Sequence, residues 1–193
     1  MNDMIFETVI TTLAGDGTPH VAPFGVRYVD GRVLLRPFKP SATLDNIRAS
    51  GHAVLNLTTD VRVFAGAVTA RWLGPRQWQL LPVPNGVRLA QALSHAVLAL
   101  EHDDQNAERP TLTLQRTHEQ QHQPFAGFNR AQAAVIEGAV LVSRLHLLAA
   151  EKIDAELAYL QIAIDKTASD DEREAWGWLQ QAVALQRRDA ASP

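Results

Sequence analysis

The chain has 193 residues, of which 46% are hydrophobic and 20% charged, so it can bury a core as one domain with an appendage or as two small domains. The formal net charge of -3 gives no overall attraction to phosphate backbones or anionic lipids, which argues against a dedicated nucleic-acid-binding or membrane-surface protein. Because the chain has no cysteine, disulfides, thiolate catalysis and zinc–thiolate or iron–sulfur sites are excluded.

The N-terminal residues are acidic and lack both a basic leader and an apolar core, so we expect no secretory signal and a cytoplasmic protein. The most apolar helical stretch, residues 131–150, contains Glu137, Ser143, Arg144 and His146. These polar residues argue against a membrane span.

The first third of the chain predicts antiparallel strands. Asp16-Gly17 and Asp30-Gly31 are hairpin-turn dipeptides, and each lies between segments rich in Val, Ile, Leu, Phe and Thr. The predicted elements are strands at 5–13, 20–28 and 32–36, a short helix at 42–50 closed by Gly51, and a strand at 53–58. Since no long crossover helix separates these strands, the pattern favours a closed or nearly closed barrel.

The middle of the chain gives weaker signals. Residues 61–68 fit either a strand or a helical turn, whereas 79–83 and 111–115 fit strands. The apolar residues of 90–101 fit a helix by one spacing and a strand by another, and we favour the strand.

From Phe128 onward the pattern is helical, with helices expected at 130–149, 152–167 and 171–187. Ser169 followed by Glu172 is a capping-box pair, and Asp170 and Asp171 add negative charge at the positive end of the last helix. The sequence therefore predicts an α+β protein, with a barrel domain at 1–124 and a helical region at 125–193.

The segment with the clearest chemistry follows the third predicted strand. Arg36 and Lys39 are cations, and Ser41 and Thr43 bring hydroxyls to the start of a helix, where free N–H groups already favour an anion. A phosphate fits this pattern. The pattern also fits a simpler structure, in which Ser41 or Thr43 only caps the helix and Arg36 pairs with Asp45.

Five segments carry a resemblance to a known fold family. The order of residues 22–26 (APFGV), 36–47 and 53–58 (AVLNLT) resembles the FMN-binding split-barrel flavoproteins, in particular their flavin-reductase-like branch. Residues 128–145 and 165–167 look like the helical C-terminal region of one such family, which is associated with tetrahydromethanopterin-linked one-carbon metabolism. The resemblance implies an antiparallel split β-barrel of the FMN-binding type, with a C-terminal helical segment, that forms a homodimer.

The resemblance also implies a set of FMN contacts. The strand from His20 would pass its backbone along the isoalloxazine, with Pro23 and Gly25 at the ring edge. The phosphate would lie at the loop after the third strand, and the ribityl chain or ring would contact the fourth strand. The implied cofactor-binding residues are His20, Pro23, Gly25, Arg36, Lys39, Ser41, Thr43, Asn46, Asn56 and Thr58.

Residues 118–122 (HEQQH) match the zinc-protease pattern H-E-x-x-H. That chemistry needs a partly buried helix, whereas this segment follows an alternating, strand-like stretch and precedes Pro124. We therefore interpret His118 and His122 as solvated loop residues and predict no metal site.

Taken together, the sequence predicts an FMN-binding flavoprotein that acts on a small molecule, as an oxidoreductase of one-carbon metabolism with an unidentified substrate. The alternative is a non-catalytic split-barrel protein that binds a ligand or serves assembly. A yellow colour of the purified protein would favour the first hypothesis.

Overall fold

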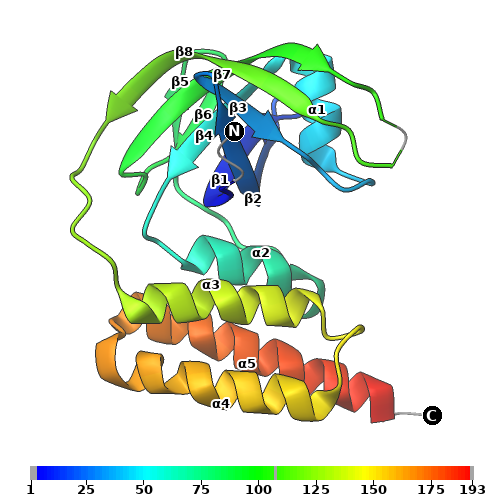
Figure 1. The fold of residues 1–193 in the computed structure, drawn as a ribbon, viewed down its shortest axis with the longest axis vertical. Coiled ribbons are helices and arrows are strands. Elements are labelled where there is room, and N and C mark those ends of the chain that lie inside the picture. The colour runs from blue at the N-terminus through cyan, green and yellow to red at the C-terminus, as the bar shows by residue number, and fades with distance from the viewer. Residues whose placement is uncertain (1–3, 107, 192–193) are drawn as a thin grey trace. The chain divides into compact units, whose positions relative to one another are not determined.

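A computed structural model describes residues 4–106 and 108–191 (Figure 1). The chain forms two compact units. The barrel unit comprises the residues up to Thr58 together with Trp78–Phe125, and the helical unit comprises Thr59–Gln77 together with the residues from Ala126 onward. Among the described residues, no helix combines the length and the apolar character that a bilayer-spanning segment requires.

The barrel unit is built on a closed antiparallel barrel whose strands follow the order β1-β2-β3-β8-β7-β4. Its strands are β1 (Phe6–Leu13), β2 (Pro19–Val29), β3 (Arg32–Leu35), β4 (His52–Leu57), β7 (Ser94–Asp103) and β8 (Leu112–Gln121). The predicted fold class, an antiparallel barrel combined with helices, is confirmed.

The two predicted hairpin turns are confirmed as the connections β1–β2 and β2–β3. Asp30 and Gly31 have φ angles of 49° and 78°, and Gly17 has a φ of 83°. Positive φ at both central residues is the geometry that matches the twist of a two-residue hairpin. Asp and Gly adopt it more readily than other residues, which explains why Asp30-Gly31 predicts its turn, whereas in the β1–β2 turn only Gly17 has a positive φ.

One end of the barrel is closed by α1 (Ala42–Ser50), which joins the end of β3 to the start of β4. Leu44 and Ile47 of α1 are buried in the same apolar cluster as inward-facing residues of the six barrel strands. The helix begins at Ser41, whose Oγ accepts a hydrogen bond from the Leu44 N–H at 3.2 Å, and ends at Gly51 with a left-handed φ of 74°. The predicted helix and both of its ends are confirmed.

The outer face of β1 and β4 is covered by a hairpin of β5 (Leu80–Val83) and β6 (Gly86–Leu89). The Thr11 hydroxyl of β1 donates to the Val87 carbonyl of β6. Gly86 lies so close to β4 that an added Cβ would be 2.9 Å from Val54 Cγ2. A side chain at this position would therefore push the hairpin away from the barrel.

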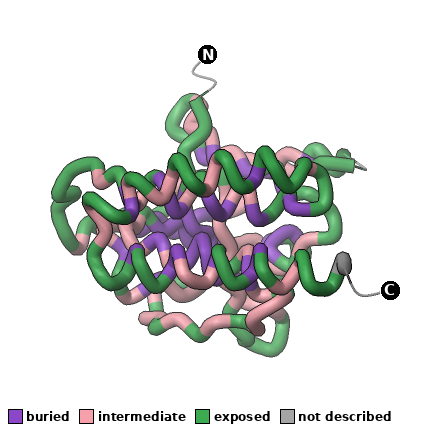
Figure 2. Tube along the Cα trace, turned by 90° about the horizontal axis from the view of Figure 1, so that it is seen from below, coloured by how far each residue is buried: buried purple, intermediate pink, exposed green. Residues whose placement is uncertain are grey.

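The helical unit contains α2 (Arg62–Leu73), α3 (Arg130–Ser143), α4 (Ala150–Thr167) and α5 (Asp170–Ala191). Helix α2 packs against α3 and α5, and α4 packs mainly against α3. Buried positions lie on the sides of the helices that face one another, and exposed positions lie on their outward sides (Figure 2). The Arg62 guanidinium ties α2 to α5 through Asp171 at 2.8 Å and Glu174 at 3.5 Å.

The middle of the chain differs from its weak sequence signals. Residues 61–68 fall almost entirely within α2, so their helical alternative is the one that forms. Residues 90–101 contain most of β7, which confirms the preferred strand. The strand expected at 111–115 extends to Gln121, because pairing with β7 continues that far.

The division expected at 124/125 differs from the two units in one respect. Residues 59–77, which lie within the first expected domain, belong to the helical unit. The reason is packing, since Val63, Phe64 and Ala65 of α2 are buried and α2 contacts α3 and α5.

The capping box at the start of α5 is observed, with the Ser169 N–H donating to Glu172 at 2.8 Å.

Two glycines of the helical unit give a matched test of this packing. An added Cβ at Gly138 of α3 would be 2.7 Å from Trp176 Cζ3 and 3.0 Å from Leu179 Cδ1, whereas one at Gly177 of α5 would meet nothing within 4 Å. We expect Gly138→Ala to lower the free energy of unfolding by about 1–3 kcal/mol through overpacking. Gly177→Ala should raise it by about 0.5–1 kcal/mol, because alanine favours a helix interior. Urea denaturation measures both changes, and stabilisation by Gly138→Ala would contradict the packing.

Candidate functional site

The barrel has an open edge along the first part of β2. One edge of this segment pairs with β1 from Pro19 to Val26. On the other edge, β3 pairs only with Arg27 to Val29, so among the described residues no strand covers the edge from Pro19 to Val26. The N–H and C=O groups on such an edge can bind the hydrogen-bonding edge of a ligand.

A loop of residues 36–41, which we call the anion loop, begins beside this open edge. Pairing between β2 and β3 stops at Arg27↔Leu34, and the chain leaves β3 after Leu35 to reach α1. The loop contains the exposed cations Arg36 and Lys39 and ends at Ser41, the N-cap of α1. The free N–H groups at the start of α1 add to the positive potential of this loop.

The anion loop is braced by the loop between β7 and β8. Lys39 Nζ donates to the Asn106 carbonyl at 3.3 Å, and Arg109 Nε donates to the Arg36 carbonyl at 3.2 Å. Arg109 Cζ also lies 3.8 Å from the centroid of the Phe38 ring. Arg109 therefore adds a third cation to the loop, although it stands 73 residues from Arg36 in the sequence.

Arg36 of the anion loop is not neutralised by a neighbouring acid among the described residues. Among the described residues, the Arg36 guanidinium forms no ion pair, and the alternative pairing with Asp45 is not observed. Asp103, at the end of β7, is paired with Arg48 of α1 at 2.7 Å. The hydrogen bond from Arg48 lowers the pKa of the Asp103 carboxyl. The arrangement suits an anion that accepts several hydrogen bonds, such as a phosphate.

The other residues expected near the phosphate differ in their accessibility. Ser41 is half-buried and its hydroxyl caps α1, as the simpler interpretation of the sequence predicts. Thr43 is only 2% exposed, which leaves little of its side chain for a ligand. Asn46 Nδ2 donates to Thr12 Oγ1 at 3.0 Å and ties α1 to β1.

The residues expected along the flavin ring lie on β2. His20 is half-buried, and burial lowers the pKa of its imidazole. Pro23 pairs with Val9 and lies within the segment that carries the open edge. An added Cβ at Gly25 would come within 2.7 Å of Ile5 Cγ2, so the glycine makes room for the protein's own side chain.

Asn56 lies on the outer face of β4, where the β5–β6 hairpin covers it. Its side chain is fully buried, and its Oδ1 accepts from the Leu89 N–H at 2.8 Å. Its Nδ2 donates at 3.2 Å to the Val9 carbonyl, the Thr11 hydroxyl and the Val54 carbonyl. These bonds join β1, β4 and β6, so Asn56 has a structural role in the barrel unit.

Thr58 follows the end of β4, whereas α1 and the anion loop lie at the end of the barrel where β4 begins. Its Oγ1 donates to the Gln91 carbonyl at 3.5 Å. The structure therefore brings Arg36, Lys39 and Ser41 together with the open edge of β2, and it separates Thr58 from them.

Two family models match the chain over most of its length. The model described as the N-terminal domain of a protein of unknown function, DUF447, matches residues 6–123, and a second DUF447 model matches residues 129–181. The chain belongs to the DUF447 family. No curated protein matches it.

Solved structures similar to this DUF447 chain include flavoproteins. One is an FMN-bound DUF447 protein from Methanosarcina mazei, with 21% identity and a TM-score of 0.75, covering 92% of this chain and 94% of the other. A flavin reductase in its native state has 18% identity and a TM-score of 0.53, covering 61% and 80% of the two chains. A flavoredoxin from Methanosarcina acetivorans has 11% identity and a TM-score of 0.52, covering 63% and 74%.

The H-E-x-x-H segment of this DUF447 chain does not lie on the helix that the zinc-protease pattern requires, and the loop expected at His118 is corrected to a strand. His118 lies on β8 and His122 just after it, and no group of three or more ligating side chains within the described residues could hold a metal ion. The two histidines instead flank His95 of β7. His95 Nδ1 is 2.8 Å from His122 Nε2, and the ring centroids of His95 and His118 are 5.9 Å apart.

The His95–His122 pair favours neutral imidazoles. His95 is 4% exposed, and its buried Nε2 has no hydrogen-bond partner. Burial first, and then the proximity of His122 and Arg88, lower the pKa of His95. Burial and Arg88 also lower the pKa of His122. A proton on either ring therefore destabilises the folded state.

This pair predicts a loss of stability in mild acid. The ordinary pKa of histidine is about 6.5. As the pH falls below that value, the unfolded chain takes up protons that the folded pair resists, so stability declines until the folded pKa values are reached. The urea midpoint should fall between pH 7.5 and pH 5.5, and it should fall less in His95→Gln. The matched control His146→Gln, which changes an exposed histidine, should retain the full decline. Equal declines in both variants would contradict the assignment.

The structural role of Asn56 gives a second prediction. Asn56→Ala should lower the free energy of unfolding by about 3 kcal/mol, because buried backbone groups on three strands lose their partner. Asn46→Ala is the control, since it removes one half-buried hydrogen bond and leaves alanine in a helix. We expect this control to change stability by less than about 1 kcal/mol. Similar losses in both variants would contradict the role of Asn56.

Proposed function

We propose that this DUF447 protein binds FMN, with the phosphate at the anion loop and the flavin ring along the open edge of β2. The proposal rests on one observation, that the open edge of β2 leads directly to the anion loop. The strand pairing that leaves the edge of β2 uncovered ends at Arg27↔Leu34, and the cationic loop starts two residues later at Arg36.

The residues of the anion loop fit a phosphate dianion. Arg36 offers a guanidinium that can bind two phosphate oxygens at once, and Lys39 offers an ammonium. Arg109 extends the same cluster, because its Nε donates to the Arg36 carbonyl and its two Nη groups make no hydrogen bond with the described residues. Ser41 and the start of α1 would add uncharged donors.

The open edge of β2 fits the hydrogen-bonding edge of the flavin ring. Backbone N–H and C=O groups between Pro19 and Val26 would orient the ring without any side-chain acid or base. When bound, FMN would supply the electron-transfer chemistry itself. The protein's own part is to fix the ring, and nearby donors and positive charge would favour its reduced, anionic form.

The FMN-bound DUF447 protein from Methanosarcina mazei supports this proposal, since it shares the fold over 92% of this chain. The flavin reductase and the flavoredoxin among the similar structures support an oxidoreductase as the function. The finer form of the proposal is a homodimeric oxidoreductase of one-carbon metabolism that acts on a small molecule, and it rests on the sequence resemblance.

A comparison of FMN with riboflavin tests the phosphate assignment. Purified protein should bind FMN and turn yellow, and Arg36→Gln with Lys39→Gln should weaken FMN binding at least about tenfold, because two charged hydrogen-bond donors are lost. The same double variant should bind riboflavin as the wild type does, since riboflavin has no phosphate. Flavin fluorescence measures both affinities.

Two further variants sharpen this test. Arg109→Gln should weaken FMN binding by about three- to tenfold, since one cation near the phosphate is lost. Arg32→Gln is the control, because Arg32 is an exposed arginine of β3 that already pairs with Glu101 at 2.7 Å. The proposal fails if the wild type does not bind FMN, or if the Arg36 and Lys39 double variant binds it normally. Reduction of the bound flavin by NADH or NADPH would separate an oxidoreductase from a non-catalytic binding protein.

A further inference from the structure

A second concave site, which we call the barrel-mouth pocket, lies at the end of the barrel opposite α1. Its lining comes from the end of β2, the end of β4, the start of β7 and the end of β8, whereas α1 joins β3 to the start of β4. The cavity measures about 280 Å³. This volume is at the lower limit of typical small-molecule sites, so the pocket suits a ligand smaller than a flavin nucleotide.

A β-bulge points two charged side chains into this pocket. Val97 of β7 pairs with His118, but the next residue, Leu98, pairs with Arg116, so Thr117 is an extra residue in β8. Residues three apart on a regular strand point to opposite faces. Because of the extra residue, Arg116 and Glu119 instead lie on the same face. Bulges of this kind are common at barrel rims and beside functional sites, where they redirect side chains.

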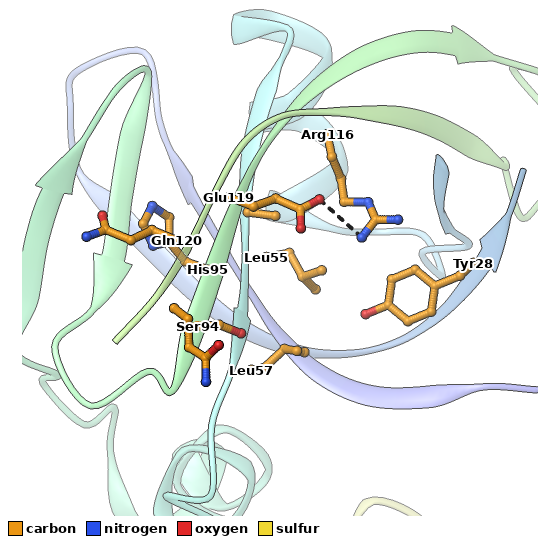
Figure 3. Close-up of a pocket in the computed structure, with 10 residues that line it drawn as sticks. Tyr28, Leu55, Leu57, Ser94, His95, Arg116, Glu119 and Gln120 are labelled. Atoms are coloured by element: carbon orange, nitrogen blue, oxygen red, sulfur yellow. Dashed lines mark ion pairs between the residues drawn. The ribbon is translucent and has the colours of Figure 1, made fainter. Parts of the chain in front are cut away.

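Arg116 and Glu119 form an exposed ion pair at the pocket (Figure 3). Arg116 Nη1 lies 3.1 Å from Glu119 Oε1, and the two side chains are 31% and 55% exposed. Arg116 Nε is held by the Gly31 carbonyl at 3.2 Å, which fixes the guanidinium. Exposed ion pairs of this kind contribute little to stability, so a ligand can part the two groups at small cost.

The remaining lining is mixed, with the Tyr28 hydroxyl, an apolar floor and the uncharged polar residues Ser94, His95, Gln120 and Gln121. The Tyr28 hydroxyl points toward the middle of the pocket in Figure 3, and it makes no hydrogen bond with the described residues. Burial raises the pKa of this hydroxyl, so it remains a donor at neutral pH. Leu55 and Ala96 form the floor as part of the barrel core, and Leu57 lies at the rim with 40% exposure.

The charges of the pocket select the class of ligand. A simple anion would meet the Glu119 carboxylate next to Arg116, and a simple cation would meet Arg116 next to Glu119. A zwitterion avoids both repulsions, because each of its charges faces the opposite one. An α-amino acid carries its ammonium and carboxylate on a single carbon atom, which matches two protein charges that are in direct contact.

We propose that the barrel-mouth pocket binds a free α-amino acid with an aliphatic side chain. Arg116 and the Tyr28 hydroxyl hold its carboxylate, Glu119 holds its ammonium, and Leu55 and Leu57 contact its side chain. The site is distinct from the anion loop, so it does not depend on flavin binding.

Titration with a matched set of ligands tests the proposal. L-Alanine, L-valine, L-leucine and L-methionine are added at millimolar concentration to isotope-labelled wild-type protein, and backbone amide resonances are followed by NMR. At least one of them should shift the resonances of Tyr28 and Glu119. For L-leucine, the matched analogues are 4-methylpentanoate, which lacks the ammonium, and 3-methylbutylamine, which lacks the carboxylate. Each analogue should bind at least about tenfold more weakly than L-leucine, because one charged contact is lost.

Three variants assign the two charges. Glu119→Gln should weaken L-leucine about tenfold and leave 4-methylpentanoate unchanged or tighter, whereas Arg116→Gln should weaken both. Arg32→Gln, which breaks the exposed pair between Arg32 of β3 and Glu101 of β7, should change neither. The spectrum of each variant also reports whether it is folded. The proposal is overturned if none of the four amino acids binds, if 4-methylpentanoate binds the wild type as tightly as L-leucine, or if neither charge variant alters binding. FMN affinity, measured on the same samples, reports separately on the anion loop.

Discussion

The insertion of α1 into one end of the barrel is the interaction on which the candidate site depends. Leu44 and Ile47 are buried among residues from all six barrel strands, so the helix cannot shift without disrupting the core. Since α1 follows the anion loop directly, its position fixes the end of that loop at Ser41. The other end is fixed at Leu35, which is also part of the core. A flexible surface loop would spread its cations, whereas this loop is held at both ends and braced by Arg109.

The parts of the fold that the sequence predicts are those specified by neighbouring residues. The turns at Asp30-Gly31, the cap at Ser41 and the left-handed Gly51 are local features, and each appears where the residues predict it. Residues 61–68 gave no such signal, because a helix that is apolar on most sides has no clear period and packing decides its form. The bulge at Thr117 depends on the pairing of β8 with β7, which no short pattern reveals.

The same distinction applies to the candidate site. Arg36, Lys39 and Ser41 are close in the sequence, so their common location could be predicted from spacing. Arg109 and the burial of Asn56 could not, since the first reaches the loop from a distant hairpin and the second is covered by β6. Asn56 also shows that a polar residue on a predicted strand is as easily satisfied by the protein as by a ligand. The barrel-mouth pocket was missed for a related reason, because only the bulge places Arg116 beside Glu119.

The discontinuity of the helical unit has a consequence for how the protein is made. The chain enters that unit after Thr58, returns to the barrel at Trp78 and leaves it again after Phe125. Helix α2 is thus synthesised before α3 and α5, the helices that pack against it. Its apolar residues Val63 and Phe64 therefore lack these partners until α3 and α5 have left the ribosome. A gene fragment ending after β8 would encode an uncovered apolar helix, and such a product is prone to aggregate. Selection against that product would favour keeping the segments before and after the end of β8 in a single gene.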